Sequence, residues 1–151
     1  AETVANKYRV GRQEQDEFGY RSHMRAIAAQ DAGKFKDEIV PVPVPQRKGD
    51  PIVVDTDEHP RATTLEKLGK LPAPFREGGT VTAGNAPSVN DGAAAVIVAS
   101  EARAKELGLK AWYSVEAYAS GAREPEWVMM APVKAVQNLM AKTGQKIDDS
   151  T

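Results

Sequence analysis

The sequence contains no cysteine among its 151 residues. This absence excludes disulfide bonds, thiolate metal sites and a cysteine nucleophile from the chain itself. It fits a reducing compartment, and we therefore expect a cytoplasmic location.

An excess of charge of one sign is also missing. The 20 lysines and arginines are balanced by 21 aspartates and glutamates, and the formal net charge is -1. A nucleic-acid binder normally carries a basic excess, so we expect no nucleic-acid partner. No apolar run approaches the length of a membrane span, and Ala1–Val4 lacks the basic and apolar regions of a signal peptide. We expect no membrane partner either.

The first third of the chain is predicted to be helical. Residues 12–31 contain no proline, and small or apolar side chains recur there at three- to four-residue spacing. This stripe comprises Phe18, Ser22, Ala26 and Ala29. Because most of these side chains are small, we expect another element to pack closely against this face.

Extended segments and a short helix are predicted next. Residues 39–45 carry proline at every second position, which fixes φ and removes hydrogen-bond donors. They are predicted to form an extended surface arm, at best an edge strand, with a proline-motif docking peptide as the alternative. Ile52–Val54 is long enough for one strand. Thr63–Glu66 has the pattern of a capping box, which opens a short helix that Pro72 stops.

In the second half, predicted strands alternate with helices, which is an α/β pattern. Strands are expected at Thr80–Thr82, at the continuous apolar run Ala93–Ala99 and at Trp112–Ala119. Ser100 is expected to cap a charged helix that Gly108 closes, and Pro132 is expected at the start of a last helix. The predicted fold class is therefore α/β.

Few residues carry chemistry by themselves. His23 and His59 lie far apart in the sequence, and the carboxylates at 55–58 lack the spacing and the glycine of a calcium loop. We expect no metal site. Residues 78–92 are rich in glycine and other small residues, which lets a ligand approach the backbone. A turn packed under a helix explains this composition equally well.

Several motifs in one order resemble the thiolase family. Val81–Ala86 followed by Asn90–Ala95 resembles the thiolase signature that precedes the last strand of the first half. Upstream, four further segments match thiolase sequence in order and spacing: Glu14–Phe18, Asp37–Val42, Arg47–Asp50 and Asp55–Glu58. The resemblance extends over essentially the whole chain and is weakest after Trp112.

The resemblance implies a layered αβαβα fold with a long lid inserted in its first half. Residues 1–89 would be the later part of the lid. Residues 90–107 would be the last strand and helix of the first half, and residues 108–151 would open the second half. Both ends of the chain are expected to be internal positions of a longer thiolase.

The resemblance also implies a reaction: cleavage of a 3-ketoacyl-CoA by CoA, or the reverse condensation of two acyl-CoAs. One cysteine of the family is the nucleophile and a second is the acid/base. A histidine and an asparagine help to build the oxyanion holes. None of these four residues is expected within the chain, so no catalytic residue is predicted here and the chain alone is expected to be inactive.

The implied partners are CoA and acyl-CoA, the remainder of a thiolase chain, and further copies in a dimer or tetramer. CoA is a substrate, and no cofactor is expected. Two alternatives remain from the sequence. One is a noncatalytic acyl-CoA-binding protein of thiolase type, and the other is a purely structural product such as a stable proteolytic core.

What the chain supplies, by this resemblance, is part of the wall that holds CoA. The matching positions are Arg61, Leu68, Phe75, Ala83, Gly84, Ser88 and Val89, with Met129 near the acyl pocket. Arg61 would lie at the adenine and phosphate end, where a guanidinium stacks on a base and attracts phosphate. Pro87 stands where many members have a serine, so either Ser88 takes over the contact with the pantetheine arm or that contact is lost. Ordinary packing or solvation is the alternative for each position.

Overall fold

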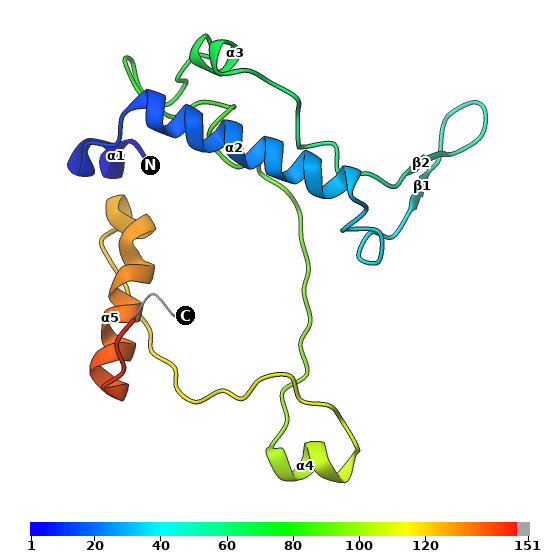
Figure 1. The fold of residues 1–151 in the computed structure, drawn as a ribbon, viewed down its shortest axis with the longest axis vertical. Coiled ribbons are helices and arrows are strands. Elements are labelled where there is room, and N and C mark those ends of the chain that lie inside the picture. Colours follow the sequence, from blue (N-terminus) through cyan, green and yellow to red (C-terminus); the bar gives the residue numbers. More distant parts are fainter. Residues whose placement is uncertain (148–151) are drawn as a thin grey trace. The chain divides into compact units, whose positions relative to one another are not determined.

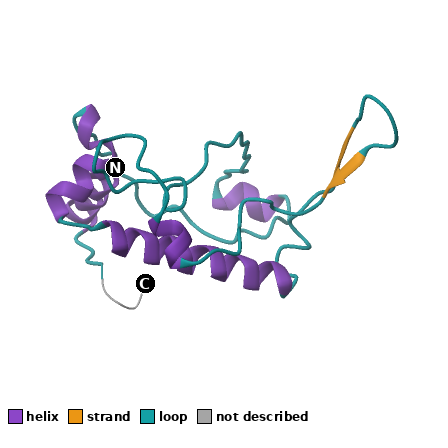
Figure 2. Ribbon diagram, turned by 90° about the horizontal axis from the view of Figure 1, so that it is seen from above, coloured by secondary structure: helices purple, strands orange, loops and turns teal. Residues whose placement is uncertain are grey.

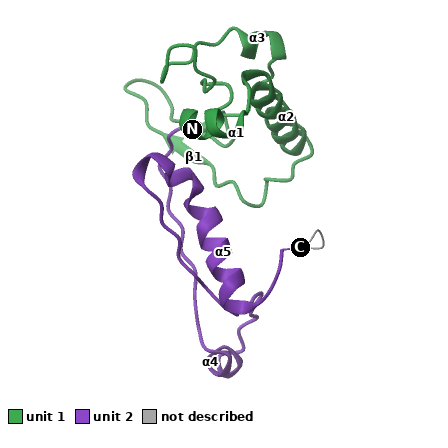
Figure 3. Cartoon of the chain, turned by 90° about the vertical axis from the view of Figure 1, so that its left-hand side faces the viewer, with its two compact units in different colours: residues 1–88 green, residues 89–151 purple. Residues whose placement is uncertain are grey.

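The computed structural model describes residues 1–147 and divides the chain into two compact units, Ala1–Ser88 and Val89–Thr151 (Figure 3). No helix among the described residues is long and apolar enough to cross a membrane.

The first unit is organised around one long helix. Helix α1 (Glu2–Tyr8) ends at Arg9, whose left-handed φ of 55° turns the chain into α2 (Arg12–Asp31) (Figure 1). The carboxylate of Glu14 accepts a hydrogen bond from the N–H of Gly11 at 2.8 Å, which satisfies one of the free donors at the start of α2. The predicted helix over residues 12–31 is confirmed.

The predicted packing face of α2 is wrong. Phe18, the largest member of the expected stripe, is 69% exposed. The buried residues of the helix are instead Asp16 and Gly19. The helix therefore packs through the carboxylate of Asp16 and the backbone at Gly19. Neither residue is apolar with a large side chain, so the apolar periodicity of the sequence does not indicate this face.

A two-stranded antiparallel hairpin follows α2. Strands β1 (Val42–Val44) and β2 (Ile52–Val54) pair in the register Val42↔Val54 and Val44↔Ile52, and they appear in orange in Figure 2. The extended surface arm predicted at residues 39–45 and the strand predicted at Ile52–Val54 are confirmed. All of their side chains are exposed, as expected for a surface arm whose proline at position 43 cannot donate to a sheet.

Helix α3 (Leu65–Gly69) begins one residue later than the capping-box pattern predicts. Its N-cap is Thr64, whose hydroxyl accepts a hydrogen bond from the N–H of Lys67 at 3.2 Å. Glu66, the expected partner in the box, pairs instead with the ammonium group of Lys70 one turn ahead. The helix ends before Pro72 is reached.

The second unit contains the predicted helices of the second half. Ser100 caps α4 (Glu101–Glu106), because its hydroxyl accepts the N–H of Arg103 at 3.2 Å. The 3-10 helix η1 (Pro125–Met130) runs directly into α5 (Ala131–Thr143), which ends at Gly144 with a φ of 73°. Proline near the start of α5 and glycine after its end confirm the predicted limits.

The segment before η1 packs against α5. Asn138 donates to the carbonyl of Ser120 at 2.9 Å, and the ammonium group of Lys142 lies 4.6 Å from the ring centre of Tyr118. A Cβ on Gly121 would lie 2.2 Å from the backbone nitrogen of Ala135, so this approach requires glycine.

The three strands predicted in the second half are absent from the described residues, where β1 and β2 form the whole sheet. Residues 93–99 and 112–119 are loops with little cover: Ile97 is 89% exposed and Tyr113 is 91% exposed. A strand needs hydrogen-bonding neighbours, and neither segment has a partner strand in the described part of the chain. At Thr80–Thr82, side chains bind the backbone donors that a sheet would have used, as described next.

Candidate functional site

The small-residue segment Thr80–Ala86, called the pinned loop below, is held at its start by a glutamate from α1. The carboxylate of Glu2 accepts the N–H groups of Thr80 and Val81, both at 2.8 Å. It also accepts the hydroxyl of Thr80 at 3.1 Å. These bonds, led by the one from Val81, lower the pKa of Glu2 below its ordinary value. The anchoring is therefore complete above the ordinary pKa of a glutamate and is lost as the pH falls through the lowered value.

An asparagine closes the pinned loop on itself. The side-chain carbonyl of Asn85 accepts the N–H of Thr82 at 2.8 Å, and its amide group donates to the carbonyl of Thr80 at 2.9 Å. The hydroxyl of Thr82, a fully buried residue, accepts the N–H of Gly84 at 3.2 Å. Every polar atom named here has a partner, so the backbone of the pinned loop has a defined conformation.

Two glycines allow the pinned loop to lie between α2 and α3. A Cβ on Gly19 would lie only 2.7 Å from the carbonyl oxygen of Gly84. A Cβ on Gly84 would lie 2.5 Å from a methyl group of Leu68 and 2.7 Å from a methyl group of Leu71. The contact between the three segments therefore depends on glycine at both positions.

The structure brings three of the predicted CoA-binding residues together in this region. Ala83 is exposed on the surface of the pinned loop, and Gly84 is half-buried beside it. Leu68 is 3% exposed and lies beneath Gly84. Ala83 and Gly84 thus present a surface of small residues, while Leu68 supports that surface from below.

Arg61 lies beside a pair of histidines that the sequence separates. Its backbone N–H donates to Nδ1 of His23 in α2 at 3.3 Å, and the ring centres of His23 and His59 are 5.9 Å apart. The side chain of Arg61 is exposed. The hydrogen bond to His23 holds the loop that carries Arg61 against α2.

No group of three or more His, Asp or Glu side chains that could hold a metal ion occurs in residues 1–147.

The remaining predicted residues are on the surface. Phe75 is 74% exposed and Ser88 is exposed, both in the first unit. Val89, at the start of the second unit, is fully exposed, and Met129 in η1 is 58% exposed. Only the resemblance in sequence groups these four residues with the pinned loop.

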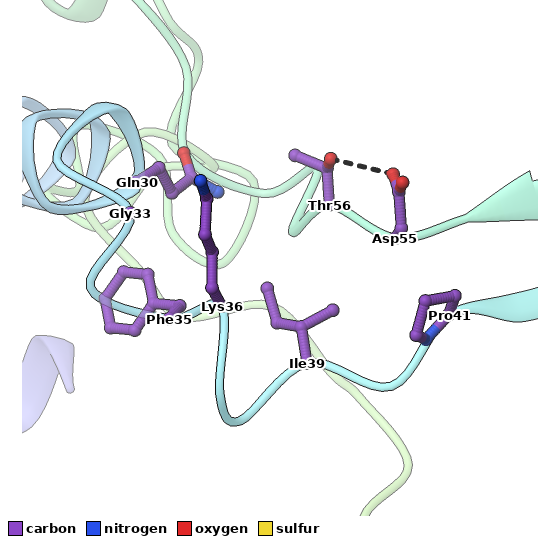
Figure 4. A pocket seen from close by; sticks show the side chains of 8 residues that line it. All are labelled: Gln30, Gly33, Phe35, Lys36, Ile39, Pro41, Asp55 and Thr56. Atoms are coloured by element: carbon purple, nitrogen blue, oxygen red, sulfur yellow. Dashed lines mark hydrogen bonds between the residues drawn. The ribbon is translucent and has the colours of Figure 1, made fainter.

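A separate open pocket of about 370 Å³ lies at the base of the hairpin. Figure 4 shows that its wall comes from the end of α2, the turn after it and the chain entering and leaving the hairpin, including Lys36, Ile39 and Asp55. None of the predicted CoA-binding residues lines it. The pinned loop, and not this pocket, is the candidate site.

Comparison with known proteins matches residues 1–102 to the family model described as Thiolase, N-terminal domain. Over 149 residues the chain is 50% identical to an acetyl-CoA acetyltransferase from Syntrophomonas wolfei, an alignment that covers 99% of this chain and 37% of that protein.

Solved structures give the same result. The acetyl-CoA acetyltransferase of Bacillus anthracis matches with a TM-score of 0.84 and 38% identity over 97% of this chain and 37% of that one. Human mitochondrial 3-ketoacyl-CoA thiolase matches with a TM-score of 0.82 and 40% identity over 96% of this chain and 37% of that one. The chain thus spans little more than a third of the length of these relatives.

Proposed function

The chain belongs to the thiolase family and has the α/β fold of the matching thiolase segment, and from this we propose that it forms part of an acyl-CoA acetyltransferase. The reaction proposed is cleavage of a 3-ketoacyl-CoA by CoA, or the reverse condensation of two acyl-CoAs. Relatives named acetyl-CoA acetyltransferase and 3-ketoacyl-CoA thiolase support this reaction class. The longer protein that would contain these residues is called the complete enzyme below.

Within the complete enzyme we assign residues 1–89 to the later part of the lid, residues 90–107 to the end of the first half and residues 108–151 to the start of the second half. We assign no catalytic residue to the chain. The covalent mechanism of the family needs a cysteine thiolate, and the sequence contains no cysteine. The chain alone should therefore form no acyl-enzyme thioester.

The proposed contribution of the chain is CoA binding, and the pinned loop is the observation that carries it. Ala83 is exposed and carries only a methyl group, so the thin pantetheine arm of CoA can lie along the backbone of the pinned loop at this position. The hydrogen bonds to Glu2 and Asn85 fix that backbone before the ligand arrives. A preformed wall of this kind reduces the ordering cost of binding.

Arg61 is proposed to bind the adenine and phosphate end of CoA. Its exposed guanidinium is available for a phosphate or a base, and its backbone is held by His23. The complete enzyme is proposed to be a cytoplasmic homo-oligomer without a resident cofactor. The exposed apolar side chains of the hairpin, among them Val44 and Ile52, support association between copies.

The first prediction concerns Arg61→Ala in the complete enzyme. We expect the KM for CoA to rise about tenfold, equivalent to about 1.4 kcal/mol, while kcat at saturating CoA stays within about twofold. The reason is that a group far from the reacting carbon contributes the same binding to ground state and transition state. Steady-state kinetics with varied CoA measures both constants.

The matched control is Arg47→Ala, which removes the same charge from the exposed turn between β1 and β2. It should leave both constants unchanged. A fall in kcat with an unchanged KM for Arg61→Ala would contradict the binding role of Arg61.

A further inference from the structure

One partly buried ion pair, between Arg12 and Asp16 of α2, lies next to the pinned loop. Asp16 in α2 is 4% exposed, and its carboxylate accepts the Nε–H of Arg12 at 2.8 Å. An isolated carboxylate at this depth would be strongly destabilising, so the pair requires further partners. Both members have them, and these partners belong to the candidate site.

Asp16 connects α2 to the pinned loop. Its second oxygen accepts the side-chain amide of Asn85 at 2.9 Å, the same amide that donates to the carbonyl of Thr80. Asn85 in turn holds the N–H of Thr82. The side chain of Asn85 therefore links Asp16 to the backbone of Thr80 and Thr82, directly before Ala83.

Arg12 connects the same helix to α3. Its Nη2 donates to the carbonyls of Leu68 and Leu71 at 2.7 and 2.9 Å. These are the two residues whose methyl groups lie against Gly84. The Arg12–Asp16 pair therefore bonds to the pinned loop through Asn85, and to the carbonyls of the two leucines that lie against Gly84.

We propose that Arg12 and Asp16 are positioning residues for CoA, which set the pinned loop and its leucine support in the conformation that accepts the pantetheine arm. This inference rests on the proposed CoA-binding function and adds two residues to it that touch no ligand. It has a specific chemical requirement. Asp16 uses two acceptor oxygens, and Arg12 uses a fork of donors pointing in two directions, so neither asparagine nor lysine can replace the set.

The test compares Asp16→Asn and Arg12→Lys with the wild type in the complete enzyme. Asparagine has one acceptor oxygen, so the bond to Arg12 or the bond to Asn85 is lost. We expect the KM for CoA to rise about threefold to tenfold in each variant, with kcat at saturating CoA within about twofold. Asp31→Asn, at the exposed end of the same helix, is the control and should leave KM unchanged.

A melting temperature measured for each variant with and without saturating CoA separates positioning from general stability. Positioning predicts that CoA raises the melting temperature of the variants less than that of the wild type. A lower melting temperature together with an unchanged KM for CoA in both variants would overturn the proposal. If the wild-type enzyme itself shows no saturation with CoA, the proposed function fails, which is a different result from failure of the positioning role.

Discussion

The 151-residue chain on its own is expected to elute from a size-exclusion column as an assembly well above its 16.3 kDa mass. Residues 93–99 form a continuous apolar run that is exposed along its length, and Ile97 within it is 89% exposed. In residues 112–119, a second segment without a partner strand, Trp112 and Val115 are 78% and 79% exposed. Apolar segments of this kind with unpaired backbone are templates for association between chains.

Light scattering on the eluted peak measures the assembly, and a double variant tests its cause. Ile97→Lys combined with Val115→Lys places a charge in each exposed segment, and it should shift the elution toward the monomer. Lys134→Glu together with Lys110→Glu changes two exposed charges at other positions and serves as the control. A wild-type chain that is a compact monomer with a cooperative melt would contradict this expectation.

Gly19→Ala should strongly destabilise the first unit. The added methyl group would lie 2.7 Å from the carbonyl oxygen of Gly84 and 3.3 Å from Cα of Asn85. Both are backbone atoms, so the pinned loop must move away from α2 or the helix must shift. Overpacking of this kind costs about 1–3 kcal/mol. We expect a melting temperature lower by several degrees in the complete enzyme and a weaker affinity for CoA.

Gly69→Ala is the matched control for Gly19→Ala. It adds the same methyl group to a helical glycine, but no atom lies within 4 Å of the new Cβ. Alanine is favoured over glycine in a helix, so this variant should be neutral or slightly stabilising. If Gly19→Ala and Gly69→Ala have the same melting temperature and the same KM for CoA, the close contact between α2 and the pinned loop does not exist in the protein.

The sequence predicts the helices well because their ends depend on local chemistry. Ser100 caps α4 and Gly144 ends α5 through bonds to residues a few positions away. The strands of the second half are predicted wrongly for the opposite reason. The apolar run at 93–99 satisfies the pattern of a buried strand, but pairing requires a neighbour, and sequence periodicity contains no information about where a neighbour is.

The candidate site is only partly predictable. The sequence indicates Ala83 and Gly84 as site residues, because both lie in a motif that resembles the thiolase signature. Asp16 four residues after Arg12 indicates only a helical ion pair, which is normally exposed and contributes little. Asp16 is buried and accepts a hydrogen bond from Asn85, which is distant in the sequence, and no local pattern shows either fact.

Amide hydrogen exchange of the complete enzyme, measured by mass spectrometry with and without CoA, tests most directly whether this chain binds CoA through the pinned loop. We expect slower exchange on adding CoA in peptides covering residues 82–89 and in the peptide containing Arg61. The hairpin peptide covering residues 42–54 is the internal reference and should exchange equally in both states. If saturating CoA slows exchange elsewhere in the enzyme but leaves residues 82–89 unchanged, the pinned loop does not bind CoA.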